Sequence, residues 1–163
     1  DLLWLAQQGL EVTGVELSEI AARDFFIEAG LAFEIQTDGS LPCFQATEMP
    51  LTIVCGDYFQ FTDAPFDGLY DRAALVALPP ELRPSYVAHT SKLLKPDATQ
   101  LLITLEYNQS MANGPPFSVL ADEVGLYWPG LKRVGELSAT STMPPKFRDA
   151  GIDEFVEVVW VMD

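Results

Sequence analysis

The sequence is poor in the residues on which metal sites, disulfide frameworks and histidine-based catalysis depend. Among 163 residues there are one histidine, His89, and two cysteines, Cys43 and Cys55. The cysteines lack a Cys-x-x-Cys spacing and are too few for a zinc site or a disulfide framework. We therefore expect no metal, little room for a histidine-dependent triad, and a reducing, cytoplasmic location.

Basic residues are also scarce. Lys and Arg number 9 against 24 Asp and Glu, which gives a formal net charge of −15. Because such a surface repels phosphate backbones and anionic lipids, we expect neither nucleic acid nor a membrane as a partner. No apolar run approaches the ~18 residues that a transmembrane helix needs, and no signal peptide is visible. With nucleic acid and membranes excluded as partners, we expect the protein to bind a small molecule.

What the sequence does contain is an alternation of strand and helix patterns. Hydrophobic residues make up 48% of the chain, enough for one domain with a core. The apolar runs that predict strands are 12–15, 51–55, 66–71, 100–105 and 155–161. Residues 18–30 predict a helix, and residues 31–50, with a turn signal at Asp38-Gly39, predict a long loop with room for a hairpin. The alternation indicates an α/β fold with a parallel sheet and helices on both faces.

A set of mostly polar residues lies at the carboxyl ends of the predicted strands, which is where ligands bind to parallel sheets. These residues are Glu16, Gly56, Asp57, Asp71, Arg72, Glu106 and Tyr107. Carboxylates at this edge suit ribose hydroxyls, the amino group of a base, or a cationic ligand. They do not suit a pyrophosphate, and the sequence has neither a GxGxxG motif nor a Walker A motif. A strand that ends at Glu16 and turns into a helix at Ser18 is typical of ribose-binding sites.

Five motifs occur in one order along the chain. They are Asp1–Ala6 with Gly9; Gly14–Glu19; Asp71–Leu78; Leu105–Tyr107 followed by Gly114–Phe117; and Arg148 with Gly151–Asp153. Together they resemble the thiopurine S-methyltransferase family, most closely its bacterial branch. The resemblance extends from Asp1 to about Val161, and the motif that begins at Asp71 is the most specific.

The resemblance implies a Rossmann-like methyltransferase sheet that binds S-adenosylmethionine. It implies that Glu16 holds the ribose hydroxyls, that Gly56 and Asp57 lie beside the adenine, and that Arg72 borders both cofactor and substrate as the catalytic residue. The substrate-binding residues that it implies are Pro115, Pro116, Phe117 and Lys146. At Lys146 the family has a second basic residue, and here Arg148 lies close by in the sequence.

The residues alone leave structural roles open. Glu16 could be a solvated strand end, and Asp57 could cap a helix at Tyr58–Phe61. Arg72 could pair with Asp71 or Glu106 as a structural bridge, and the two prolines could do no more than stiffen a loop.

We predict transfer of a methyl group from S-adenosylmethionine to the thiol or selenol of a small, mostly aromatic, thiopurine-like acceptor by a monomeric enzyme. The sulfonium is already a good electrophile, so the protein has mainly to align the reactants. An NAD-dependent oxidoreductase is an alternative, because a carboxylate after the second strand serves both cofactors. A non-catalytic nucleoside-binding relic is another.

The chain begins at Asp1 rather than at a methionine. Members of the family carry a further segment before this position, including the first strand of the sheet. We therefore expect residues 1–163 to be a single-domain fragment without its first strand, which would lie between strands 12–15 and 66–71. Such a fragment is expected to be molten or aggregation-prone by itself and to bind S-adenosylmethionine poorly.

Overall fold

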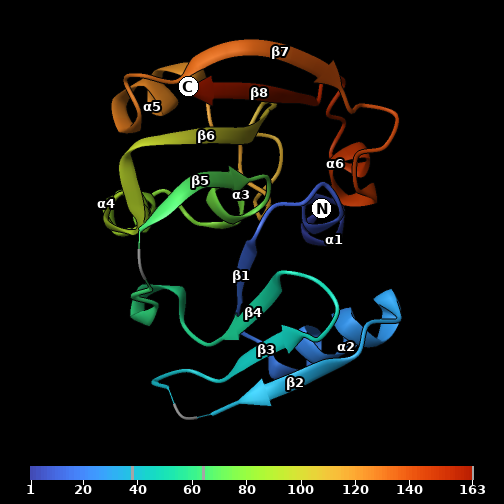
Figure 1. Ribbon diagram of the computed structural model, residues 1–163. Helices are drawn as coiled ribbons and strands as arrows, with labels where there is room; N and C mark the ends of the chain where they lie inside the picture. Colours follow the sequence, from blue (N-terminus) through green and yellow to red (C-terminus); the bar gives the residue numbers. More distant parts are fainter. Residues whose placement is uncertain (38, 64, 163) are drawn as a thin grey trace. The chain divides into compact units, whose positions relative to one another are not determined.

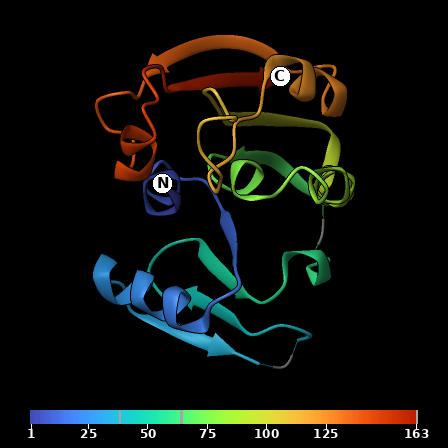
Figure 2. The ribbon, with the colours of Figure 1, turned by 180° about the vertical axis from the view of Figure 1, so that it is seen from behind.

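The computed structural model describes residues 1–37, 39–63 and 65–162 (Figures 1 and 2). The chain divides into two compact units, residues 1–63 and residues 64–163, which we call the N-terminal and the C-terminal unit. The prediction of a single domain stays a prediction. In the described part of the chain, no helix has the length and apolar character needed to cross a bilayer.

The N-terminal unit is a four-stranded sheet with two α-helices. Its elements are α1 (Leu2–Gln7), β1 (Val12–Glu16), α2 (Glu19–Ala29), β2 (Phe33–Gln36), β3 (Cys43–Ala46), β4 (Leu51–Cys55) and the 3-10 helix η1 (Tyr58–Gln60). The strand order is β1-β4-β3-β2, with β1 and β4 parallel and the other pairs antiparallel. Strands β2 and β3 form the hairpin for which residues 31–50 had room. Its expected Asp38-Gly39 turn falls partly outside the described residues.

Helix α2 begins and ends where the sequence predicts. The Ser18 side chain accepts a hydrogen bond from the Ala21 amide at 3.2 Å, which satisfies one amide of the first turn. Gly30 ends the helix in the left-handed conformation, with φ of 66°, which costs least for glycine. The helix buries Ala22 and Phe26 against the sheet, where Phe26 packs beside Phe44.

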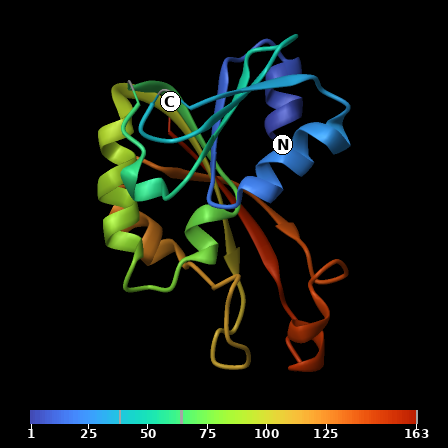
Figure 3. The same ribbon diagram turned by 90° about the horizontal axis from the view of Figure 1, so that it is seen from below.

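The C-terminal unit has a second four-stranded sheet. Its elements are β5 (Phe66–Asp71), α3 (Ala74–Ala77), α4 (Arg83–Leu93), β6 (Leu94–Glu106), α5 (Ala121–Tyr127), β7 (Lys132–Ser138), α6 (Pro145–Asp149) and β8 (Val156–Met162). The strand order is β5-β6-β8-β7, with β5 and β6 parallel and β8 antiparallel to both of its neighbours. Pro84 lies in the first turn of α4, where its missing amide costs no hydrogen bond. The loop after β6, gold in Figure 3, runs from the end of that strand towards α5.

The two sheets are mixed rather than wholly parallel. Parallel pairing joins β1 to β4 and β5 to β6, the strands whose connections contain helices or long segments. A parallel pair needs such a crossover, whereas the six residues between β2 and β3 suffice only for an antiparallel hairpin. Among the described residues, β1 and β5 each pair on one side and so form the edges of their sheets. The expectation of a further strand between them stays a prediction.

Candidate active site

The three predicted cofactor-binding residues of the N-terminal unit lie together at the carboxyl ends of the parallel strands β1 and β4. Glu16 ends β1 and is in register with Cys55, which ends β4. The Gly56 amide donates to the Glu16 carbonyl at 2.9 Å, and Asp57 follows directly. A Cβ at Gly56 would lie 2.6 Å from Leu41 Cδ2, so a larger residue would displace that side chain.

The Glu16 carboxylate is half-buried and has one oxygen fixed. Its Oε1 accepts a hydrogen bond from the Ser18 amide at 2.8 Å. Its Oε2 receives no hydrogen bond from the described residues. The Ser18 bond holds the side chain at the strand end, and Oε2 is left for a donor such as a ribose hydroxyl.

Asp57 has the structural role that the sequence left open. Its Oδ1 accepts from the Phe59 amide at 3.0 Å and caps η1. The residue is exposed, so its second oxygen can still meet a ligand. The contact with adenine stays a prediction.

Cys55 is the buried thiol nearest to these strand ends. Burial and the negative charges of Glu19 and Glu16 raise the pKa of its thiol. The thiol hydrogen bonds to the Leu17 carbonyl, with 3.9 Å between sulfur and oxygen. Since the thiolate is the nucleophile, a thiol with a raised pKa is a poor candidate for covalent chemistry.

In the C-terminal unit, Arg72 follows the last residue of β5. Its side chain is 48% exposed, and Nη2 lies 3.5 Å from Glu157 Oε1 on β8. Glu106, one of the bridge partners that the sequence left open, is bound by Arg133. A half-exposed ion pair at this distance contributes little to stability, about 0–1 kcal/mol. The pair with Glu157 therefore adds little to the stability of the fold.

Asp71, which precedes Arg72, serves the fold. It is 3% exposed and accepts hydrogen bonds from the Ala74 amide at 3.0 Å, the Leu75 amide at 3.3 Å and the Tyr86 hydroxyl at 2.8 Å. Burial raises the pKa of this carboxyl, and these hydrogen bonds oppose the rise. Asp71 therefore fixes α3 and α4 at the end of β5, and its oxygens are directed at the protein itself.

The four predicted substrate residues form one assembly, although three lie on the loop after β6 and the fourth on α6. Lys146 Nζ donates to the Pro115 carbonyl and, at 3.3 Å, to the Asn113 carbonyl. The Phe117 amide donates to the Val76 carbonyl at 2.6 Å, so the loop is joined to α3, which follows Arg72. The Lys146 side chain thus holds the loop by binding the loop's backbone carbonyls.

Tyr107 is a residue of this assembly whose role the sequence analysis missed. Its hydroxyl donates to the Pro116 carbonyl at 2.7 Å, and its ring stacks on Phe155 with centroids 5.2 Å apart. Burial raises the pKa of the hydroxyl, so it remains protonated and keeps its donor. The signal that could have found it was its position directly after β6, in the fourth motif.

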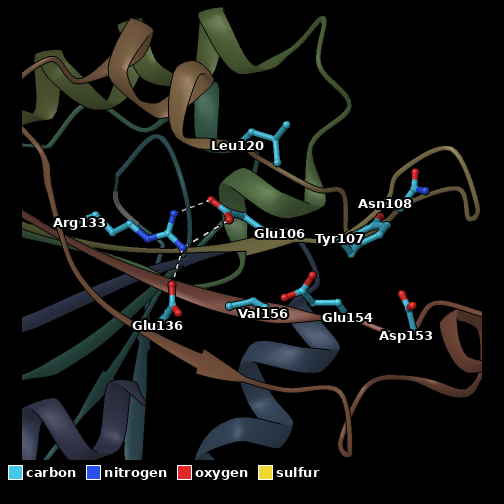
Figure 4. A pocket seen from close by; sticks show the side chains of 9 residues that line it. All are labelled: Glu106, Tyr107, Asn108, Leu120, Arg133, Glu136, Asp153, Glu154 and Val156. Carbon is cyan, nitrogen blue, oxygen red and sulfur yellow. Dashed lines mark hydrogen bonds and ion pairs between the residues drawn. The ribbon is translucent and has the colours of Figure 1, made fainter.

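A cavity of about 280 Å³ lies at the same end of β6 (Figure 4). It is lined by Glu106, Tyr107, Asn108, Leu120, Arg133, Glu136, Asp153, Glu154 and Val156. Arg133 is bound there by Glu136 at 2.7 Å and by Glu106 at 3.3 Å. A second cavity, of about 260 Å³, lies on the β2–β3 hairpin and touches no predicted site residue.

The fold of the chain resembles that of solved structures. A crystal structure of an S-adenosylmethionine-dependent methyltransferase from Methanosarcina mazei superposes with a TM-score of 0.65 at 15% identity, covering 98% of this chain and 85% of that one. This likeness shows the fold class that the sequence predicts, the Rossmann-like fold of these methyltransferases.

Sequence comparison gives the family. The family model for thiopurine S-methyltransferase matches residues 1–163. A thiopurine S-methyltransferase of Photobacterium profundum is 39% identical over 165 residues, with 100% of this chain and 76% of the relative covered. One from Pseudomonas fluorescens is 47% identical over 135 residues, with 81% and 61% covered. The chain belongs to the thiopurine S-methyltransferase family. Membership confirms the predicted enzyme class, a methyltransferase, and the predicted cofactor, S-adenosylmethionine.

Proposed function

We propose that this enzyme methylates the thiol or selenol of a small, mostly aromatic acceptor of the thiopurine kind. The observation that carries the proposal is the Pro115–Phe117 loop, which is fixed by Lys146 and Tyr107 and joined to α3 beside Arg72. Two prolines and a phenylalanine offer an apolar surface that suits a flat ring. A guanidinium near such a surface suits a ring that carries negative charge.

When bound, S-adenosylmethionine supplies a methyl group that is already electrophilic. Glu16 binds the cofactor through its ribose hydroxyls, with Gly56 and Asp57 beside the adenine. Arg72 lowers the pKa of the acceptor's thiol, because a nearby positive charge favours the anion. Once its proton has passed to solvent water, the acceptor's anionic sulfur would be held by Arg72, and the bound cofactor would supply the methyl group that this sulfur accepts.

The groups available as bases limit which acceptors the enzyme can use. The pKa of the Tyr107 hydroxyl is raised and the hydroxyl donates a hydrogen bond to the Pro116 carbonyl, so it stays protonated and is a poor base at neutral pH. Asp71 is buried and its oxygens accept from α3 and Tyr86. An acceptor that ionises by itself near neutral pH, such as an aromatic thiol or a selenol, avoids the need for a base.

The family assignment weighs against an NAD-dependent oxidoreductase. The catalytically inert relic, the monomeric state, the cytoplasmic location and the absence of nucleic-acid and membrane partners stay predictions. Of these, only the relic changes the function, and a turnover assay decides it.

The test uses the full-length protein with four matched acceptors: thiophenol, benzeneselenol, phenol and aniline. We expect S-adenosylhomocysteine to form with the thiol and the selenol, at rates that follow acceptor ionisation, and with neither control. Cofactor binding without turnover on any acceptor would identify a relic. Turnover on phenol or aniline at rates equal to those on thiophenol would contradict the assigned acceptor class.

A further inference from the structure

Arg83 is a buried arginine outside the motifs that identify the family. It is the first residue of α4 and is 1% exposed. Its Nη1 lies 2.8 Å from both oxygens of Glu123 on α5, and its Nε donates to the Leu78 carbonyl at 3.0 Å. A buried charge is tolerated only when it is paired in this way, so these contacts fix the guanidinium in one position.

The remaining face of the guanidinium meets the substrate loop. The Arg83 guanidinium carbon lies 5.7 Å from the centroid of the Phe117 ring, within the range of a cation–π interaction. Among the described residues, the buried Nη2 finds no hydrogen-bond acceptor. An unpaired buried donor destabilises a fold. Contact with the Phe117 ring is thus an interaction that the guanidinium makes in addition to its hydrogen bonds.

The position of the Phe117 ring is also constrained by its own loop. A Cβ built on Gly114 would overlap the Phe117 ring, so the ring lies directly against the Gly114 backbone. The Phe117 amide is held by the Val76 carbonyl. Pro115 and Pro116 lie between these two contact points, and a shift of the ring would move both.

We propose that Arg83 is a positioning residue that fixes the Phe117 ring, and through it Pro115 and Pro116, for binding of the acceptor. This inference rests on the proposed function, because it takes the loop as the acceptor's binding surface. Arg83 acts on acceptor affinity rather than on cofactor binding or methyl transfer. A lysine would keep the charge beside Glu123 but lose the planar group that Phe117 faces.

The test compares Arg83→Lys with a matched control, Arg23→Lys. Arg23 is also paired with a glutamate, Glu19, and lies 5.5 Å from an aromatic ring, Phe44, but on α2 of the N-terminal unit. In the full-length protein we expect Arg83→Lys to raise the KM for thiophenol roughly tenfold, which lies within the range for loss of a cation–π contact. The KM for the cofactor and kcat should stay within about twofold. Arg23→Lys should change none of these constants.

Hydrogen exchange at the Phe117 amide gives a readout that does not need turnover. Exchange should be faster in Arg83→Lys and unchanged in Arg23→Lys, even if thiophenol proves not to be a substrate. If Arg83→Lys fails to fold, the pair Arg83→Met with Glu123→Met removes both buried charges together and should show the same exchange and KM changes. An unaltered KM for thiophenol with unaltered exchange at Phe117, in a folded variant, would overturn the inference and leave the proposed function intact.

Discussion

Glu16 and Asp71 hold equivalent positions in two different sheets, and the protein uses them differently. Each is the last residue of a strand in a parallel pair, and a helix follows each. Glu16 is half-buried with one oxygen held by the Ser18 amide, whereas Asp71 is buried and bound by two amides and a hydroxyl. Position at a strand end therefore does not by itself identify a ligand-binding carboxylate. The donors that the fold directs at its oxygens decide the role.

The comparison is tested most strongly by removing the buried carboxylate. Asp71→Ala leaves the first amides of α3 and the Tyr86 hydroxyl without their acceptor. Loss of a cap costs about 0.5–2 kcal/mol and each unsatisfied buried group about 1–3 kcal/mol. We expect the free energy of unfolding to fall by about 3 kcal/mol in urea denaturation. Glu16→Ala is the control, with an expected loss below about 1 kcal/mol. Equal losses in the two variants would contradict the distinction.

The local part of this architecture could be predicted from sequence, because it depends on residues close together in the chain. Ser18 and Gly30 mark the ends of α2, and Pro84 marks the first turn of α4. The hydrophobic patterns likewise located β1, β4 and β5. The short helices α3 and α6 were not predicted, since four or five residues carry too little periodicity.

The parts that could not be predicted depend on residues far apart in the sequence. Arg83 and Glu123 are separated by 40 residues, and Lys146 and Pro115 by 31. Nothing in the local pattern around Glu106 shows that Arg133 binds it. For the same reason the sequence placed Asp71 among the ligand-facing carboxylates, since its partner Tyr86 lies on another element.

The second test concerns Glu16. If its carboxylate accepts from the ribose, Glu16→Gln should weaken binding of S-adenosylhomocysteine by roughly 1.5–3 kcal/mol, the range for a hydrogen bond to a charged group. The amide keeps an acceptor for the Ser18 amide, so the fold should be unaffected. Calorimetric titration of the full-length protein measures the effect. Affinities that agree within error would show that Glu16 is only a strand end.

A third test uses the pH dependence of stability to examine the buried carboxylate, Asp71. The folded-state pKa of Asp71 is raised above the usual 3.8 by burial, so the folded protein binds this proton more tightly than the unfolded chain does. Its contribution to stability is therefore fully present below pH 3.8 and is lost as pH rises through the folded pKa. Asp71→Asn removes this dependence. The free energy of unfolding of the variant should therefore rise relative to that of the wild type as pH increases from 4 towards 7. Parallel urea-denaturation profiles for wild type and Asp71→Asn would contradict the assignment.

The smallest expected change in stability is at Arg72, next to Asp71 in the sequence. Because its ion pair with Glu157 is long and half-exposed, Arg72→Ala should lower the free energy of unfolding by less than about 1 kcal/mol. Turnover of thiophenol should fall far more than cofactor affinity does, since the guanidinium favours the anionic acceptor. Arg72→Lys should recover only part of the rate, because it supplies the charge without the planar fork. Glu157→Gln removes the pair but leaves the guanidinium, and so separates the two roles of Arg72. If Glu157→Gln and Arg72→Ala lower turnover equally, the pair itself is what matters; if only Arg72→Ala does, the guanidinium acts on the acceptor.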